Sequence, residues 1–214
     1  DVGSCGEVDE RLAGAGRAMA KGGKFDVAIA GAGVFGSWIA LALARRGNRV
    51  LIADLHGAGN SRSSSGGETR IIRMSYGADE LYTEMSARSL PEWKKLAPEF
   101  FVPCGALFTA RPGWPHFEAS FDALRRARIR HQRLALRALR ARYPQIRHPA
   151  KNEGLFEPDS GVLLARRATQ AVFDAAVAAG AMFVQTGLKP DEFRERFPAE
   201  RYVFACGPWL PRLF

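Results

Sequence analysis

The sequence is poor in cysteine. Its three cysteines, Cys5, Cys104 and Cys206, are odd in number and far apart. A disulfide framework needs paired cysteines, so this scarcity argues against a secreted disulfide scaffold and indicates a reducing, cytoplasmic setting. No two cysteines have the spacing of a metal site, and the four histidines do not cluster with them. The sequence therefore predicts no bound metal.

Long apolar runs are absent, and acidic residues are fewer than basic ones. No stretch of about 18 uncharged apolar residues occurs, so we expect no membrane-spanning helix and no membrane partner. The net charge of +9 can mark nucleic-acid binding or can be a compositional habit. Eight arginines in residues 125–142 are interleaved with leucines at mixed spacing. This pattern is typical of an amphipathic segment with a solvated outer face, so we expect no nucleic-acid partner.

The first 23 residues are rich in glycine and alanine and show no sustained periodicity. They also lack the apolar run of a secretory signal. We predict that residues 1–23 form a disordered or non-native tail, with Met19 as a candidate natural start.

A compact strand–turn–helix–strand unit follows this tail. Phe25–Ala30 has the length and apolar character of a strand, and Ser37–Arg46 has helical spacing. Gly47 is a suitable residue to end that helix, and Arg49–Asp54 predicts a second strand. The turn between the first strand and the helix is Gly31-Ala-Gly-Val-Phe-Gly36.

This turn has the glycine spacing of a dinucleotide-binding loop. Gly31, Gly33 and Gly36 allow a tight turn and a close approach to a pyrophosphate, which the helix N-terminus attracts. Asp54, at the end of the second strand, is placed to accept hydrogen bonds from a ribose hydroxyl. The motif alone leaves NAD and FAD open, as well as a glycine-rich turn that binds nothing.

Further elements follow along the chain. Gly and Ser residues predict a loop over 57–67. The spacing predicts helices over 79–96, 116–129 and 167–179, and a shorter helix ending near 143–144. It predicts strands over 105–109, 181–185 and 202–205, and two short strands within 154–165 around residues 158–161.

Three later segments, in this order, decide between the cofactors. They are Ser63-Ser-Ser-Gly-Gly-Glu-Thr-Arg-Ile-Ile-Arg73, Glu157-Pro-Asp-Ser-Gly-Val162 and Val203-Phe-Ala-Cys-Gly-Pro-Trp209. Together with the glycine turn, they resemble the flavoprotein amine oxidases of the monomeric sarcosine oxidase and N-methyltryptophan oxidase type, within the D-amino-acid-oxidase-like superfamily. The resemblance covers residues 24–214 and implies FAD as the cofactor.

The resemblance implies an α/β fold, with a Rossmann-like FAD-binding domain and part of an α+β substrate domain. We expect a discontinuous FAD-binding domain over 24–76 and 150–214, and the partial substrate domain over 77–149. Because the family continues beyond the position of Phe214, we expect the chain to be truncated at its C-terminus and inactive on its own. Gly187–Ala199 is short for the β-meander of the family, which leaves a deletion or mis-splicing open.

Specific roles follow from the resemblance. The cofactor-binding residues it implies are Gly31, Gly33, Gly36, Asp54, Ser65, Thr69, Arg70, Gly207 and Trp209. Thr69 and Arg70 are expected against the flavin ring, and Arg73 is expected to hold a substrate carboxylate. Arg70 and Arg73, the candidate catalytic residues, share a face if the segment forms a helical turn.

Two departures from the family pattern limit these roles. A histidine often stands just before the Gly-Asp-Thr-Arg run of sarcosine oxidases, and here that position is Gly66. Neither Cys104 nor Cys206 stands at the position of the cysteine that binds FAD covalently.

The implied reaction is the FAD-dependent oxidation of the C–N bond of an amino acid or N-methyl amino acid to an imine. Oxygen then reoxidises the flavin and gives hydrogen peroxide. The expected partner is a small amine or amino-acid substrate, and the oligomeric state stays open. The alternatives are a NAD-linked dehydrogenase, an inactive fragment, or an arginine-rich binding protein.

Overall fold

A computed structural model describes residues 24–214, so the tail expected over 1–23 lies outside the described residues. The chain divides into two compact units. Of the described residues, the first unit contains 24–68 together with Ala165–Phe214, and the second contains Thr69–Leu164.

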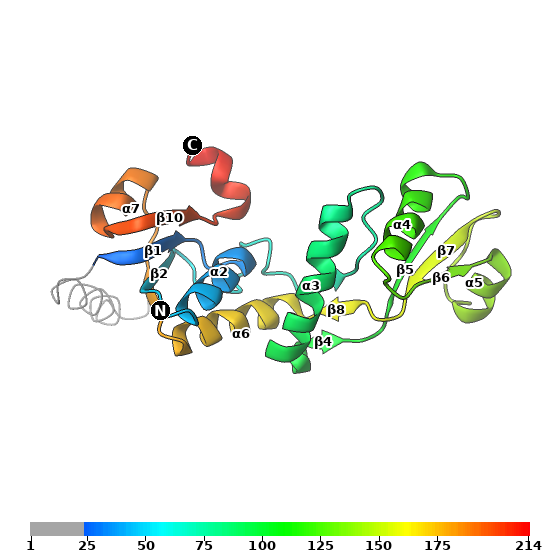
Figure 1. Ribbon diagram of the computed structural model, residues 1–214, viewed down its shortest axis with the longest axis horizontal. Helices are drawn as coiled ribbons and strands as arrows, with labels where there is room; N and C mark the ends of the chain where they lie inside the picture. The colour runs from blue at the N-terminus through cyan, green and yellow to red at the C-terminus, as the bar shows by residue number, and fades with distance from the viewer. Residues whose placement is uncertain (1–23) are drawn as a thin grey trace, which may run out of the picture. The chain divides into compact units, whose positions relative to one another are not determined.

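The first unit alternates strands and helices (Figure 1). Its elements are β1 (Phe25–Ala30), α2 (Val34–Ala44), β2 (Val50–Asp54), α6 (Ala165–Ala178), β9 (Met182–Gln185), α7 (Pro190–Arg196), β10 (Ala199–Phe204) and the 3-10 helix η2 (Gly207–Arg212). The strands form a parallel sheet in the order β10–β1–β2–β9. This parallel α/β sheet confirms the predicted fold class.

Helices cover both faces of the parallel sheet. On one face α2 packs against α6, and Ile29 of β1 points toward Gly36 of α2. On the other face Phe193 of α7 is buried in a cluster with Leu51 of β2. Figure 1 shows α7 on the opposite side of the sheet from α2 and α6. Strands that are apolar on both faces fit this sandwiched position, because neither face meets water.

Helix α2 begins three residues earlier than predicted, directly at the glycine turn. Its N-cap is Gly33, which has no side chain to mark the start in the sequence. It ends at Ala44, two residues before the predicted Arg46, and Gly47 closes it as predicted. Gly47 has φ +82°, and its N–H donates to Ala44 over 2.9 Å while the Asn48 N–H donates to Leu43 over 3.2 Å. This pair of bonds is the Schellman arrangement that favours glycine.

Helix α7 fills the short stretch where the family resemblance suggested a β-meander. Pro190 occupies its first turn, and the Lys189 N–H donates to the Glu192 carboxylate over 3.2 Å. Phe193 and Phe197 are one helical turn apart and both are buried in the core. Strand β10 then begins at Ala199, three residues earlier than predicted.

The second unit contains two antiparallel sheets, in the orders β3–β8–β4 and β5–β7–β6. Its elements are β3 (Arg70–Ile72), α3 (Glu80–Leu96), the 3-10 helix η1 (Pro98–Phe100), β4 (Phe101–Val102), β5 (Ala106–Ala110), α4 (Pro115–Arg126), β6 (Gln132–Leu134), α5 (Leu136–Arg142), β7 (Glu153–Glu157) and β8 (Gly161–Leu163).

Strand pairing fixes where the second unit begins and ends. Arg70 of β3 pairs with Leu163 of β8, and Ile72 pairs with Gly161. The units therefore divide at 68/69 and 164/165, whereas the sequence-based ranges divide at 76/77 and 149/150. The assignment of an FAD-binding and a substrate role to these ranges stays a prediction.

The helical turn considered for Arg70 and Arg73 was wrong. Arg70 begins strand β3, and Arg73 follows the end of this strand. The β-branched pair Ile71-Ile72 favours an extended backbone, and pairing with β8 stabilises it. The two arginines therefore do not share a helix face.

Candidate cofactor site

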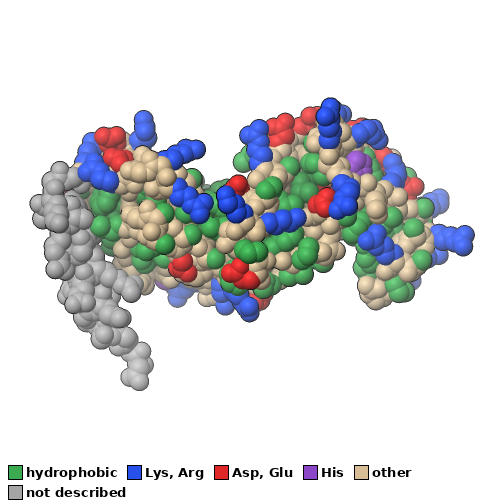
Figure 2. Space-filling view, turned by 60° about the horizontal axis from the view of Figure 1, so that its bottom comes forward, with side chains coloured by type: hydrophobic (Ala, Val, Ile, Leu, Met, Phe, Trp, Pro, Cys, Tyr) green, Lys and Arg blue, Asp and Glu red, His purple; other side chains and the backbone are tan. Residues whose placement is uncertain are grey.

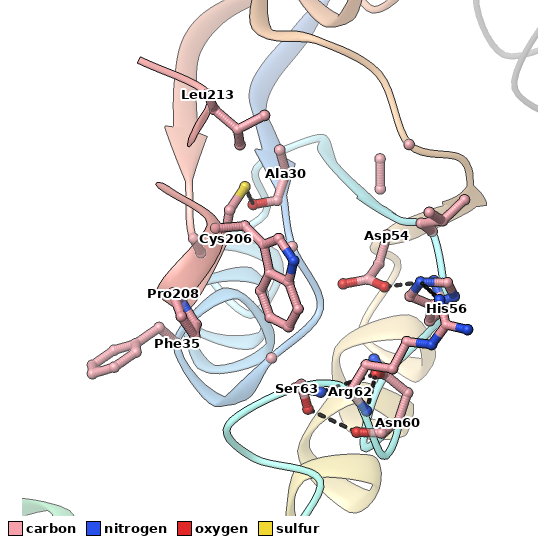
Figure 3. A pocket seen from close by; sticks show the side chains of 18 of the residues that line it. Ala30, Phe35, Asp54, His56, Asn60, Arg62, Ser63, Cys206, Pro208 and Leu213 are labelled. Atoms are coloured by element: carbon pink, nitrogen blue, oxygen red, sulfur yellow. Dashed lines mark hydrogen bonds between the residues drawn. The ribbon is translucent and has the colours of Figure 1, made fainter. Parts of the chain in front are cut away.

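A cavity of about 780 Å³ lies in the first unit, beside the carboxyl ends of β1, β2 and β10. Residues from four segments line it, within Ala30–Phe35, Ala53–Ser65, Thr186–Lys189 and Ala205–Leu213, together with Phe193 of α7 (Figure 3). Ligands of open α/β sheets bind in such crevices outside the carboxyl ends of the strands. Its size lies within the range of cofactor pockets.

Two glycines of the turn are required by close backbone approaches. Gly31 has φ +108°, and a Cβ added there would lie 2.5 Å from the Ala205 carbonyl oxygen. A Cβ added to Gly36 would lie 1.8 Å from the Gly31 carbonyl oxygen. Gly36 is buried inside α2 and therefore shapes the turn, while Gly31 and Gly33 line the cavity.

Asp54 stands at the end of β2 and faces the cavity (Figure 3). Its carboxylate accepts the Ala32 N–H over 2.8 Å and the His56 N–H over 2.8 Å. Each carboxylate oxygen has a second lone pair, so Asp54 can still accept a hydroxyl. This placement suits the ribose contact predicted for it.

The N-terminus of α2 opens onto the cavity. Gly33 caps it without a side-chain hydrogen bond, and the Val34 N–H donates to the Ser65 hydroxyl over 3.2 Å. Unpaired N–H groups and the helix dipole make such an end attractive to phosphate. With the glycine turn and Asp54, this end could hold the ADP half of FAD.

The segment after β10 closes another side of the cavity. Cys206, Gly207 and Trp209 line it, and the Cys206 thiol donates to the Ala30 carbonyl over 3.4 Å. Burial raises the pKa of the Cys206 thiol, and the nearby charge of Asp54 raises it further. These two effects favour the neutral thiol, which donates its hydrogen bond to the last residue of β1.

Asn60 organises the cavity loop and was not singled out in the sequence. Its side-chain oxygen accepts the N–H groups of Arg62 and Ser63 over 3.0 and 3.1 Å. A Cβ added to Gly66 would lie 1.8 Å from the Asn60 carbonyl oxygen. This close approach explains why glycine stands at position 66. The Asn-x-x-Ser spacing is the signal that could have identified the turn.

Two exposed side chains of the same loop also line the cavity. His56 and Arg62 lie together, with a guanidinium nitrogen 3.2 Å from the imidazole Nε2. No signal in the sequence marked this pair.

Thr69, Arg70 and Arg73 belong to the second unit, whereas the residues lining the cavity belong to the first. Thr69 and Arg70 are exposed, and the Arg70 guanidinium donates to the Thr69 carbonyl over 3.1 Å. Arg73 donates to the Ser75 hydroxyl over 3.2 Å. The structure therefore brings together the predicted residues for the ADP half, and the predicted flavin and substrate contacts stay predictions.

Several arginines of the basic run 125–142 form ion pairs with acidic residues from other segments of the second unit. Arg133 contacts Glu118 over 2.7 Å and Glu153 over 2.6 Å, and Arg126 contacts Glu80 over 2.8 Å. The hydrogen bonds from Arg133 lower the pKa of the Glu118 carboxyl. Figure 2 shows acidic side chains among the basic ones on the face it draws. The expectation of no nucleic-acid partner stays a prediction.

Residues 24–214 contain neither a candidate membrane-spanning helix nor a candidate metal site. The helices there lack the length and apolar character needed to cross a bilayer. Over the same residues, no three side chains of His, Cys, Asp or Glu come together as a metal site.

The parallel sheet, glycine turn, helix N-terminus and strand-end aspartate define a dinucleotide-binding domain of the Rossmann type. The family described as "FAD dependent oxidoreductase" (DAO) matches residues 26–214. The chain belongs to this family. The match confirms the predicted family and the predicted cofactor, FAD, over the NAD alternative.

The chain is similar to curated relatives over most of its length. It is 29% identical to "Peroxisomal sarcosine oxidase" of Homo sapiens over 204 residues, covering 88% of this chain and 52% of the relative. It is 32% identical to "N-methyl-L-tryptophan oxidase" of Salmonella dublin over 206 residues, covering 89% of this chain and 55% of the relative. The chain thus spans about half the length of the curated relatives it matches.

Solved structures share the fold. A fructosyl peptide oxidase has a TM-score of 0.73 at 22% identity, covering 87% of this chain and 51% of that one. Glycine oxidase from Geobacillus kaustophilus has a TM-score of 0.69 at 21% identity, covering 89% and 57%. These likenesses support the fold.

Proposed function

We propose that the whole protein is an FAD-dependent oxidoreductase that oxidises the C–N bond of an amino acid or N-methyl amino acid to an imine, with oxygen as the electron acceptor and hydrogen peroxide as a product. The observation that carries this proposal is the cavity beside the carboxyl ends of the strands, with Gly31, Gly33, Asp54 and Ser65 around one helix N-terminus. The relatives named as sarcosine and N-methyltryptophan oxidases support the class of substrate.

In the first unit, we assign different residues to different parts of FAD. Gly31, Gly33 and the α2 N-terminus bind the pyrophosphate, and Asp54 binds the ribose. Ser65, Gly207 and Trp209 complete the cofactor contacts, and Gly36 keeps the turn closed. FAD, when bound, supplies the electron acceptor, while the protein supplies orientation and charge.

In the second unit we assign Thr69 and Arg70 to the flavin ring and Arg73 to the substrate carboxylate. A cation beside the flavin stabilises negative charge that develops during reduction. A guanidinium can bind a carboxylate through two parallel hydrogen bonds, which a lysine cannot do. The family pattern Thr69-Arg70-Ile71-Ile72-Arg73 supports these assignments.

The test is a peroxide assay on the whole protein with FAD. We expect peroxide with N-methylglycine or N-methyltryptophan and none with methylamine, which lacks the carboxylate that Arg73 binds. Arg73→Lys should raise KM for the amino acid more than it lowers kcat, because the lysine keeps the charge and loses the paired geometry. Turnover of methylamine as fast as of the amino acids would contradict the carboxylate assignment.

The activity of the 214-residue chain alone and its cellular location are also part of the proposal. We propose that the 214-residue chain alone has no oxidase turnover. Strands β10 and β9 form the edges of its parallel sheet, and the apolar side chains of Trp209, Leu210 and Phe214 are exposed. We also propose a cytoplasmic location, supported by the free thiols of Cys104 and Cys206.

A further inference from the structure

Glu157, in the Glu-Pro-Asp-Ser-Gly motif, is a buried carboxylate that the proposed function does not use. It lies at the end of β7 and is 1% exposed. Its oxygens accept the Met74 N–H over 2.7 Å, the Ser75 N–H over 3.2 Å and the Ser160 hydroxyl over 3.0 Å. A buried carboxylate is costly unless such donors satisfy it. Glu157 therefore fixes the backbone of residues 74 and 75.

That backbone leads directly to Arg73. The Ser75 side chain is fully buried, and its hydroxyl accepts a hydrogen bond from the Arg73 guanidinium over 3.2 Å. The guanidinium carbon lies 4.8 Å from the centre of the Tyr76 ring. A hydroxyl and an aromatic ring hold the cation without neutralising its charge. Arg73 thus keeps its charge for an anionic ligand while its direction is set.

A second contact holds the other side of the segment. The Ser86 hydroxyl of α3 donates to the Arg73 carbonyl. The peptide group between Arg73 and Met74 is therefore held at both ends, by Glu157 of β7 through the Met74 N–H and by Ser86 of α3 through the Arg73 carbonyl. All of these residues lie in the second unit.

We propose that Glu157 and Ser75 are positioning residues that orient the Arg73 guanidinium for the carboxylate of the substrate. Glu157 acts through the Ser75 N–H, and the Ser75 hydroxyl acts on Arg73. The inference rests on the proposed carboxylate role of Arg73. It gives the Glu-Pro-Asp-Ser-Gly motif a function at the substrate site, through a chain of hydrogen bonds within one unit.

The test uses the whole protein with FAD and compares Glu157→Gln and Ser75→Ala with a control, Glu153→Gln. Glu153 lies on the same strand but pairs with Arg133 at the surface. The probe is propionate, titrated by the change in flavin absorbance, with propionamide as the uncharged comparison. The second readout is the side-chain nitrogen resonance of Arg73 by NMR, which does not depend on turnover.

We expect each of the two variants to weaken propionate binding about tenfold or more, because small misplacements of a binding group cost that much. Propionamide binding and the Glu153→Gln control should stay unchanged. The Arg73 resonance should move toward that of a solvated arginine in both variants. The double variant should lose little more propionate affinity than the single variant with the larger loss, because both residues act on Arg73 through the same hydrogen bonds.

The outcomes separate the inference from the proposed function. Native protein that binds propionate, with both variants binding it equally well and an unchanged Arg73 resonance, overturns the inference. Native protein that does not bind propionate overturns the carboxylate role of Arg73 instead. If Glu157→Gln fails to fold, Ser75→Ala still tests the orientation of Arg73, because it keeps every donor to Glu157 and removes only the hydroxyl that Arg73 contacts; an unchanged Arg73 resonance in this variant overturns the inference.

Discussion

The carboxylate of Asp54 accepts the backbone N–H of Ala32 over 2.8 Å. This bond joins the end of β2 to the middle of the glycine turn that follows β1. The same side chain faces the cavity beside the α2 N-terminus. Asp54 therefore both shapes the turn and offers a charge to the cofactor, so one substitution can test both roles.

Asp54→Asn should weaken FAD binding by about 10-fold to 100-fold, because a hydrogen bond to a charged acceptor contributes about 1.5–3 kcal/mol. Asparagine keeps an oxygen that can accept the Ala32 N–H, so the turn should survive. Fluorescence titration of flavin-free protein measures the change.

The matched control for this substitution is Asp26→Asn. Asp26 lies on β1 and pairs with Arg49 over 3.2 Å, outside the residues that line the cavity. It should leave FAD affinity unchanged. Equal losses in the two variants would refute a specific ribose contact by Asp54.

Gly31→Ala should destabilise the protein more than Gly47→Ala. Both glycines have positive φ, so both substitutions cost about 1 kcal/mol or more in backbone strain. Only Gly31 adds a clash, with a Cβ 2.5 Å from the Ala205 oxygen, whereas nothing lies within 4 Å at Gly47. Urea unfolding of both variants measures the difference. Equal midpoints would show that the close approach of residue 205 is absent in solution.

Cys206 should react slowly with iodoacetamide at pH 8. The raised pKa keeps the thiol protonated at pH values where an ordinary cysteine is partly ionised, so the reaction rate should rise only at higher pH. Asp54→Asn removes one cause of the shift and should speed the reaction at pH 8. Mass spectrometry of flavin-free protein follows the modification, with exposed Cys104 as the internal comparison. If Asp54→Asn leaves the rate of Cys206 modification unchanged, the charge of Asp54 does not raise the pKa of this thiol.

Phe193→Ala should cost about 3–5 kcal/mol of the free energy of unfolding, because it empties a space in the core between α7 and the sheet. Phe193 is 2% exposed. The comparison is Phe35→Ala, at a side chain that is 73% exposed, where a change below about 0.5 kcal/mol is expected. Denaturant unfolding without flavin checks both. A small loss at Phe193 would mean that α7 does not pack on the sheet.

The sequence predicted the part of the cavity that a local pattern forms. The first strand, the glycine turn, the helix and Asp54 at the end of the second strand lie in one continuous segment, so spacing alone was enough to place them. The helix stop at Gly47 followed from backbone geometry.

Other parts depend on tertiary contacts that no local pattern carries. Helix α7 is short, and burial of Phe193 and Phe197 against the sheet accompanies its formation. Gly66 is explained by the nearby Asn60 carbonyl, six residues away in the chain but in contact in the fold. The strand at Arg70–Ile72 needs its partner β8, about ninety residues later, so helical spacing misled the prediction.

The proposed function depends above all on the binding of FAD by this chain. The most direct measurement is the visible absorption spectrum of the whole protein after purification and dialysis, followed by titration with FAD and with NADH. We expect a yellow protein that retains FAD, or that takes it up tightly, and no saturable binding of NADH. A folded, colourless protein that does not bind added FAD would contradict this expectation.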